Sequence, residues 1–449
     1  MIMSENILKI SIPSNNIKER QYIISILFRD ILNVNYHLEI DEYADYTSIN
    51  FGDKIFIIQD HFWNNHKIDK SYLQVENIPD RVRFANSNGI RDLPIIYGVD
   101  LYEENSQEIV CGIDIFASAF FLLTRWEEFV LGREMTGKCD ETKLLCVKSE
   151  CTKRAIVNEY IDWLKIIFDK IGIAYVVNDF RKIMITHDVD RCYLSSFTVL
   201  IKNLLCLVFK EKQYKKAIIS LKNYLTYKIQ GLSPFDCYDE LMDYSDTYGI
   251  KNYFYFKACS FGESGWTYSV DEPKVTKSIK NILKRGHYVG IHPSESTFNN
   301  NFQFVCEYQR LCAIVGDDVI CGGRNHGLFY NMNSFNQWNN LLQYDSGLGY
   351  QHFNGFRCGI CYPYHMFDLV KQEILNILEI PFVAMDSVAM RNKWTPNEAL
   401  IDVIETINIV NRYQGTICIN WHSNLINTIE RKYHKKVYFK IIEHLANLP

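Results

Sequence analysis

From Ile183 onward, short apolar runs of β-strand type alternate with segments whose apolar residues recur at helical spacing. Such runs are typical of buried strands, and the helical spacing places apolar side chains on one helix face. Strands that alternate with helices predict parallel pairing and right-handed crossovers. About seven such units follow one another, so we predict an α/β fold with a deformed (β/α)7-type barrel.

The predicted strands of this region are 183–185, 252–256, 287–291, 318–321, 343–345, 381–385 and 415–420. The predicted helices are 156–171, 238–248, 274–285, 303–315, 334–342, 366–378 and 397–413. Gly286 follows one of these helices directly, which is the expected C-terminal stop.

The first part of the chain carries a smaller α/β pattern of its own. The elements predicted there are strands 54–59 and 93–97 and a helix 114–129. A polar, charged stretch before residue 150 predicts a connection, and we assign the amphipathic helix 156–171 to the domain after this connection. We therefore predict an accessory α/β domain of residues 1–150 and a barrel domain of residues 151–449.

A long helical insertion is predicted at about 193–231. Residues 197–209 are strongly apolar, while the following residues up to Lys228 are rich in lysine. One interpretation is peripheral membrane contact through 197–228, by a helix that lies on anionic lipid. The other is a helical hairpin packed on the core with a solvated basic face. We favour the second, because buried helices have the same apolar pattern.

Composition narrows the class of protein. Apolar residues make up 47% and charged residues 22% of the 449 residues, as in ordinary globular proteins. A net charge of −5 argues against a nucleic-acid partner. No secretory signal or transmembrane span is recognisable, and the 14 cysteines are scattered, so we expect a cytoplasmic location. The single CxxC motif, Cys358 to Cys361, has no second pair, and simple packing is the favoured explanation.

Polar, chemically competent residues directly follow the predicted strands. Because the carboxyl ends of parallel strands share one face of the fold, residues far apart in sequence can meet in one pocket. Two carboxylates as close as Asp188 and Asp190 repel each other unless one keeps a proton or a cation lies between them. The strand-end residues are Thr186, His187, Asp188, Asp190, His292, Arg324, His326, Asp345, Asp386 and His422.

From Ile183 to His422 the chain resembles the polysaccharide deacetylases of carbohydrate esterase family 4. That family begins with a strand ending in Thr-Phe-Asp-Asp-Gly, and here Thr186-His-Asp-Val-Asp190 stands in that place. The family's second motif, His-Ser/Thr-x-x-His, corresponds to His292-Pro-Ser-Glu-Ser296, with Ser296 in place of a metal-binding His. Arg324-Asn-His326 and Trp421-His422 stand at its third and last motifs.

The resemblance implies a metal-dependent hydrolase that removes an N-acetyl or O-acetyl group from an amino sugar or a surface polysaccharide. It implies Asp188 as the general base, Arg324 as the residue that orients it, and His422 as the general acid. Asp345 and Asp386 are both candidates to keep His422 charged. The stretches Tyr344-Asp345-Ser, Gly355-Phe-Arg357 and Met385-Asp386 resemble a branch of the superfamily found beside surface-glycan genes, which also carries a similar N-terminal module. The resemblance therefore makes His187, Asp345, Arg357 and Asp386 candidates to contact the substrate or to surround its site.

The same resemblance implies a divalent metal, with Zn2+ favoured, bound by Asp190 and His292. A catalytic zinc site usually has three protein ligands. With Ser296 in place of a histidine, the third ligand could be His326, His187 or a water molecule. We favour His326, because it follows the next strand after His292.

Two alternatives to an active enzyme stay open. One is an inactive deacetylase fold that binds a glycan, with Trp266, Tyr268, Tyr362 and Tyr364 stacking on sugar rings. The other is a scaffold protein of surface-glycan assembly that docks through the N-terminal domain. Metal content separates the first from an enzyme, and a truncation that lacks residues 1–150 tests the second.

Overall fold

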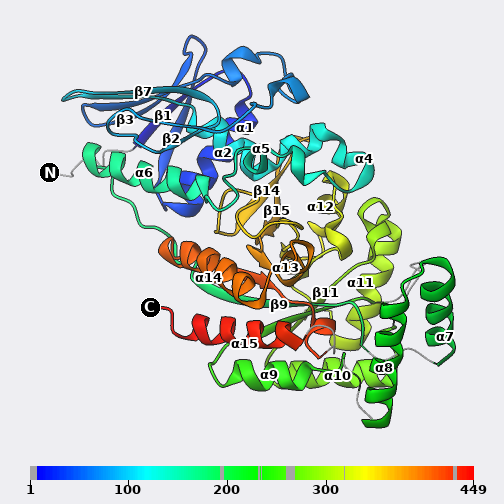
Figure 1. Cartoon of the computed structure of the whole chain (residues 1–449). Helices are drawn as coiled ribbons and strands as arrows, with labels where there is room; N and C mark the ends of the chain where they lie inside the picture. The colour runs from blue at the N-terminus through cyan, green and yellow to red at the C-terminus, as the bar shows by residue number, and fades with distance from the viewer. Residues whose placement is uncertain are drawn as a thin grey trace.

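The structure, a computed structural model, consists of a small N-terminal α/β domain that packs on a larger α/β domain (Figure 1). Both contain a mixed sheet covered by helices, as the alternating pattern predicts. The described residues are 8–192, 197–230, 233, 235–258, 268–317, 319–427 and 432–449.

The N-terminal domain is built on a six-stranded sheet of order β2-β1-β3-β4-β8-β7. Its strands are β1 (Leu8–Pro13), β2 (Tyr36–Asp41), β3 (Tyr46–Phe51), β4 (Lys54–Gln59), β7 (Gly98–Glu104) and β8 (Glu108–Ile113). A two-stranded ladder of β5 (Arg83–Phe84) and β6 (Pro94–Ile95) lies apart from it. The predicted strand 54–59 is confirmed, and that at 93–97 is reduced to β6.

Helices of this domain pack on the sheet and reach toward the second domain. They are α1 (Ile17–Ile24), its π-helical continuation (Ser25–Ile31), α2 (Ile115–Thr124), α3 (Trp126–Glu128), α4 (Glu134–Thr136), α5 (Leu145–Lys148) and α6 (Ile156–Ile171). The carboxylate of Asp114 caps α2 by accepting a hydrogen bond from the Ala117 amide. Arg125, with φ 53°, then interrupts the single helix predicted at 114–129.

The helix α6 packs on the N-terminal sheet, although the sequence pattern assigned it to the second domain. The Tyr160 hydroxyl donates to the Pro94 carbonyl at 2.9 Å, and the Trp163 indole donates to the Gly89 carbonyl at 2.8 Å. Phe168 lies against Phe28, with ring centroids 5.2 Å apart. The packing therefore associates α6 with the N-terminal domain, while the boundary at residue 150 stays a prediction.

The second domain contains a nine-stranded sheet of order β14-β15-β13-β12-β11-β10-β9-β17-β16. Its strands are β9 (Lys182–Val189), β10 (Asn252–Phe256), β11 (Tyr288–Ile291), β12 (Gly322–Gly323), β13 (Tyr344–Asp345), β14 (Tyr364–Asp368), β15 (Glu373–Glu379), β16 (Ala384–Met385) and β17 (Thr416–Asn420). Its helices include α9 (Tyr238–Asp246), α10 (Pro273–Lys284), α11 (Asn301–Val315), α12 (Met332–Trp338), α13 (Asp386–Arg391), α14 (Pro396–Arg412) and α15 (Lys432–Ala446).

The predicted deformed barrel is not confirmed, because the sheet is open in the part of the chain that the structure describes. The strands from β15 to β16 are all parallel, but β14 pairs antiparallel with β15 and ends the sheet on that side. The α/β class is confirmed, and the parallel strands still bring their carboxyl ends to one edge.

The helix predicted at 366–378 is wrong, since this stretch forms the β14–β15 hairpin. The carboxylate of Asp368 accepts hydrogen bonds from the amides of Val370 and Lys371, which makes a turn there, and Gln372 has a positive φ of 55°. In β15 the side chains of Leu375, Ile377 and Glu379 are buried at every second position. The clustered apolar residues of this stretch fit both periods, and the turn decides between them.

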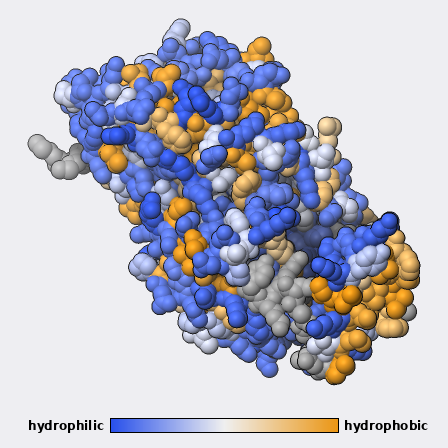
Figure 2. All heavy atoms as spheres, viewed as in Figure 1, coloured by the Kyte–Doolittle hydropathy of each residue, from blue (hydrophilic) through white to orange (hydrophobic). Residues whose placement is uncertain are grey.

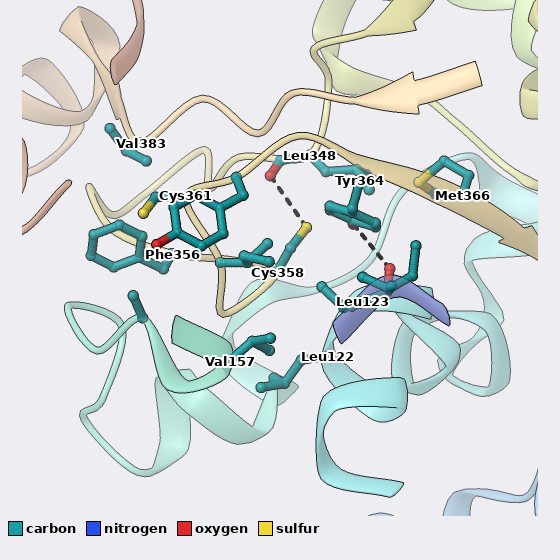
Figure 3. Packing of buried hydrophobic residues seen from close by; sticks show 14 of the residues in the cluster. Leu122, Leu123, Val157, Leu348, Phe356, Cys358, Cys361, Tyr364, Met366 and Val383 are labelled. Atoms are coloured by element: carbon teal, nitrogen blue, oxygen red, sulfur yellow. Dashed lines mark hydrogen bonds between the residues drawn. The ribbon is translucent and has the colours of Figure 1, made fainter. Parts of the chain in front are cut away.

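The two domains share a continuous apolar core. Figure 3 shows Leu122, Leu123 and Val157 of the N-terminal region packed against Phe356 and Cys358 of the second domain. The Tyr364 hydroxyl donates to the Leu123 carbonyl at 2.9 Å. Both cysteines of the CxxC motif are buried in this core, and burial raises the pKa of the Cys358 thiol to about 12. Packing, the favoured explanation for this motif, is consistent with their position.

A buried charge cluster fastens the same interface. Arg357 donates to both carboxylate oxygens of Glu128 in α3, at 2.9 and 2.7 Å, and Arg125 donates to Oε1 at 2.8 Å. The Tyr330 hydroxyl donates to Oε2, and Arg133 donates to that hydroxyl at 3.1 Å. Burial would raise the pKa of Glu128, but the guanidinium groups hold it far below its usual value. The expectation that Arg357 serves the substrate is therefore wrong, because its guanidinium is occupied at the domain interface.

The insertion forms a helical hairpin of α7 (Phe197–Leu205), a π-helical turn (Cys206–Lys210) and α8 (Tyr214–Gln230). Figure 1 shows the two helices side by side at the edge of the molecule. Many of their large apolar side chains are exposed to solvent, so the favoured core-packed hairpin is wrong on this point. In the described residues, no helix combines the length and apolar character needed to cross a membrane.

We predict that Arg357→Ala destabilises the protein by about 3–5 kcal/mol, because it leaves a buried carboxylate with fewer partners. Urea unfolding followed by tryptophan fluorescence measures the change. The matched control is Arg181→Ala, which removes an exposed guanidinium paired with Asp179, and which should leave the unfolding free energy unchanged. Equal effects of the two substitutions would contradict the role of the buried cluster.

Candidate metal centre and acid–base pair

The strand β9 presents alternate side chains to opposite faces of the sheet. Asp188 and Thr186 point to the side where Arg324, the residue after β12, lies, since both accept hydrogen bonds from its guanidinium. His187 points to the other side, where its Nδ1 lies 2.7 Å from the Trp421 carbonyl and its ring stacks on Phe254. Burial lowers the pKa of His187 to about 4, so it is a neutral core histidine. His187 is thus excluded as a ligand.

Asp188 is held in one orientation by two buried donors. Arg324 Nη1 donates to Asp188 Oδ1 at 2.8 Å and to the Thr186 hydroxyl at 3.0 Å. Asn420 Nδ2, at the end of β17, donates to Asp188 Oδ2 at 2.7 Å. Burial would raise the pKa of Asp188, but Arg324 and the nearby histidines lower it below its ordinary value. Asp188 is therefore an ionised carboxylate in a nearly dry site.

Arg324 is fixed as firmly as the carboxylate that it holds. It is completely buried, and its remaining N–H groups donate to the carbonyl and the hydroxyl of Ser346, at 2.5 and 3.1 Å. The two glycines before it form β12, and a Cβ atom on Gly323 would lie 1.9 Å from the Ile291 carbonyl oxygen. The close approach of β11 and β12 thus requires glycine, and it carries Arg324 to the side of Asp188.

Asp190, His292 and His326 come together from three strand ends. Asp190 Oδ1 lies 3.4 Å from His292 Nε2 and 3.7 Å from His326 Nε2. One ligand atom from each residue lies within 4.8 Å of the others, a spacing that fits coordination of a single ion. The backbone joins these loops, because the His326 amide donates to the Pro293 carbonyl and the Arg324 amide donates to the Ile291 carbonyl. The favoured ligand set of the sequence analysis is brought together.

The hydrogen bonds around these three residues fit a cation. His292 Nδ1 lies 2.6 Å from the Arg324 carbonyl, a pure acceptor, so Nδ1 carries a proton and Nε2 is the ring nitrogen that faces Asp190. Asp190 Oδ1 is buried and has no hydrogen-bond donor among the described residues. A buried carboxylate needs a positive charge beside it, which a metal ion bound between Asp190 and the two histidines would supply. These residues could therefore hold a divalent metal ion.

His422 stands opposite the three potential ligands, and Asp386 holds it. The ring Nδ1 lies 2.6 Å from Asp386 Oδ1, and the backbone amide of His422 donates to Asp386 Oδ2 at 3.0 Å. The other ring nitrogen, Nε2, lies 3.9 Å from Asp188 Oδ2 and 4.0 Å from Asp190 Oδ2. Burial alone would lower the pKa of His422, but Asp386 and the two other carboxylates raise it to about 10. His422 therefore carries a proton at neutral pH.

The second candidate partner of His422, Asp345, has a different role. Its carboxyl group is hydrogen-bonded to Glu379 of β15, and burial raises the pKa of both groups. Glu379 Oε1 also accepts a hydrogen bond from the Leu348 amide at 2.9 Å. Asp345 is thus half of a buried carboxyl pair, and Asp386 is the partner of His422.

Several residues were placed differently from, or missed by, the sequence analysis. Ser296 is exposed and bonded to Gln303, away from the ligand group. Asn420 and Ser346 were missed, although each lies at or just beyond a strand end like the residues that were found. Glu295 was also missed, and its Oε1 lies 3.5 Å from His326 Nδ1. Because mainly Asp, His and Arg were considered as site residues, two others were missed. These are Asn420, whose side-chain amide orients Asp188, and Ser346, whose hydroxyl orients Arg324.

The tyrosines proposed for sugar stacking are core residues. Tyr268, Tyr362 and Tyr364 are buried, and their hydroxyls donate to the carbonyls of Val189, Tyr413 and Leu123. Trp266 lies outside the described residues. The glycan-binding alternative therefore gains no support from these three aromatic side chains.

Comparisons with known proteins give limited guidance. Residues 8–172 match a family described only as a family of unknown function (DUF7033). No curated protein matches the chain. A solved structure from Mycobacterium smegmatis, provisionally described as a polysaccharide deacetylase, is 13% identical with a TM-score of 0.39, and the match covers 61% of this chain and 87% of that one. Likeness at this level carries no argument about chemistry, so the function must be argued from the site itself.

We expect His292→Ala to abolish stoichiometric zinc binding, and His326→Ala to weaken it about tenfold or more, since each removes one of three protein ligands. Equilibrium dialysis with elemental analysis measures both. Ser296→Ala is the matched control and should bind zinc like the wild type, because its hydroxyl is bonded to Gln303 at the surface. Full zinc binding by His292→Ala would exclude this centre.

Proposed function

We propose that the protein is a metal-dependent carbohydrate deacetylase that hydrolyses the N-acetyl or O-acetyl group of an amino sugar or of a surface polysaccharide. The observation that carries this proposal is the joint arrangement of an ionised Asp188, a protonated His422 and three potential ligands. His422 Nε2 lies 3.9 Å from Asp188 Oδ2, and Asp190 lies 3.4 Å from His292. Hydrolysis of an amide needs a base for water, a charge for the oxyanion and an acid for the leaving amine.

Asp188 is suited to take the proton of the attacking water. Arg324 and Asn420 keep it ionised and fix its plane, so it needs no reorientation during the reaction. Its Oδ2 faces His422, on the side where the substrate would lie. General base help of this kind contributes typically about 10²–10⁴-fold in rate.

His422 is suited to give its proton to the departing amine. Asp386 holds Nδ1, so the proton on Nε2 is the one directed into the site. A leaving amine must be protonated before the C–N bond breaks, and a histidine charged at neutral pH supplies that proton. After release of the products, water returns the proton from Asp188 to the solvent and His422 is recharged.

The favoured metal is zinc, which Asp190, His292 and His326 would hold. When bound there it would supply a Lewis acid that polarises the acyl oxygen and makes water more acidic. The Arg324 carbonyl orients His292 through its Nδ1–H, which leaves Nε2 available as the ligand atom. A site of two histidines and one carboxylate suits zinc, and it leaves room for substrate.

Substitution of Asp188 tests its proposed role as the general base. Asp188→Asn should reduce acetate release from the best substrate by about 10²–10⁴-fold while zinc content stays unchanged, because Asp188 bonds Arg324 instead of belonging to the ligand group. Acetate release from a panel of N-acetylated nucleotide sugars and glycans identifies that substrate. Near-normal turnover by Asp188→Asn would rule out this base, and zinc binding without acetate release from any substrate would favour a glycan-binding protein.

The pH dependence of activity tests the proposed role of His422 as the general acid. Activity should fall as pH rises through the pKa of His422, which the carboxylate of Asp386 raises above its ordinary value. Asp386→Asn removes the charge that raises this pKa, so the alkaline limb of the kcat/KM profile should move to lower pH. Asp345→Asn, the other candidate from the sequence, serves as the control and should leave that limb in place. An unmoved limb in Asp386→Asn would show that another group donates the proton.

A further inference from the structure

The helical hairpin of α7 and α8 exposes two apolar stripes. In α7 and its continuation, the exposed residues recur every four positions, and in α8 every three or four, so each set lies on one helix face. The exposed side chains are Phe197, Ile201, Leu205, Phe209, Tyr214, Ile218, Leu221, Leu225 and Ile229. In Figure 2 the side of the molecule that carries the hairpin has a large hydrophobic patch.

These stripes are not the contact between the two helices. The inner side of the hairpin is made by Leu200, Ala217 and Tyr224, which are buried, and Phe197 meets Tyr224 at its edge with ring centroids 6.2 Å apart. The outer side chains are far more open, with 76% of Phe209 and 83% of Ile229 exposed. Contiguous apolar surface of this kind marks a place of interaction.

Basic residues surround the apolar stripes. Residues 197–230 contain seven lysines and a single acidic residue, Glu211, in a chain whose net charge is −5. All seven lysines are exposed: Lys202, Lys210, Lys212, Lys215, Lys216, Lys222 and Lys228. Lys222 lies four residues after Ile218, and Lys228 lies three after Leu225, so both flank the α8 stripe. Lysines at the border of an apolar face can extend their charge to a neighbouring anionic surface.

We propose that this hairpin docks the protein onto an anionic lipid membrane. Apolar residues on one face and lysines beside them are the pattern of a helix that lies in the interface of a bilayer. The apolar stripes would enter the boundary of the acyl chains, and the lysines would meet phosphate headgroups. A second copy of the chain fits less well, because a two-fold contact would bring two sets of seven lysines together.

The hairpin is inserted directly at the edge of the sheet that carries the candidate site. Asp190 follows the last residue of β9, and α7 begins at Phe197. The insertion therefore joins the lipid-facing surface to the strand that positions Asp188 and Asp190. The hairpin and the candidate site are thus connected through the end of one strand. Docking of the hairpin on a membrane does not depend on the proposed chemistry.

Co-flotation of the full-length protein with lipid vesicles tests the proposal. We expect the protein to float with phosphatidylcholine vesicles that contain phosphatidylglycerol, and to float far less with pure phosphatidylcholine. Higher salt should weaken the binding, since it screens the lysines. A variant with Phe209→Ser, Ile218→Ser and Ile229→Ser should bind the phosphatidylglycerol vesicles at least about tenfold more weakly than the wild type.

A matched control keeps the same number of lost apolar side chains. Tyr43→Ser, Ile68→Ser and Phe302→Ser change equally exposed residues outside the hairpin and should float like the wild type. Lys215→Gln with Lys222→Gln and Lys228→Gln should reduce the preference for phosphatidylglycerol. Circular dichroism and thermal unfolding should show all three variants folded, because every changed side chain is exposed.

Three outcomes would overturn the proposal. One is a wild-type protein that stays with the bulk solution in the presence of phosphatidylglycerol vesicles. Another is equal flotation of the hairpin variant and the control variant. The third is a dimer, measured by light scattering without lipid, that the hairpin variant converts to a monomer, since a second copy would then be the occupant of the stripes.

Discussion

The candidate site depends on the buried pair of Arg324 and Asp188. A carboxylate removed from water would ordinarily take up a proton, and only a strong, well-oriented partner keeps it charged. Here the guanidinium donates at 2.8 Å, and its other N–H groups are used by Thr186 and Ser346. With four of its five N–H groups donating to these partners, Arg324 is fixed in position, and so is the carboxylate that it holds. Such a pair does little for stability, because desolvation offsets its attraction, and its value is the fixed geometry.

The loop after β12 organises both halves of the site. Arg324 holds the Asp188 carboxylate with its side chain, and its backbone carbonyl holds His292 by the Nδ1–H. Two residues later the same loop supplies His326, with its amide bonded to the Pro293 carbonyl. A shift of this loop would therefore disturb Asp188 and two of the three potential ligands together. This explains how two carboxylates only two residues apart have different surroundings. Asp188 is enclosed by hydrogen-bond donors, whereas Asp190 faces potential ligand atoms of two histidines.

The strand-end rule predicted most of this arrangement from the sequence. Asp188, Asp190, His292, Arg324, His326 and His422 all lie where carboxyl ends of parallel strands meet, and the open sheet preserves that rule without a closed barrel. The rule fails where the face of the strand or a partner elsewhere in the fold determines where the side chain lies. His187 is on the strand but on its other face, and Asp345 turns toward Glu379. Arg357 is claimed by Glu128, more than two hundred residues away, and no local pattern encodes such a partner. The 366–378 error arose because one Asp-centred turn outweighs an ambiguous apolar pattern.

The two buried charge clusters of the molecule differ in a way that separates structure from chemistry. Around Glu128 every carboxylate oxygen accepts at least one hydrogen bond, from Arg125, Arg357 or Tyr330, and no acceptor is left over. Around Asp190 the balance is different, because its buried Oδ1 accepts no hydrogen bond from the described residues and lies 3.4 Å from His292 Nε2. A closed network of this kind contributes rigidity and resists any new partner. An open one can accept a new partner such as a cation, which is why the second cluster and not the first is the candidate centre.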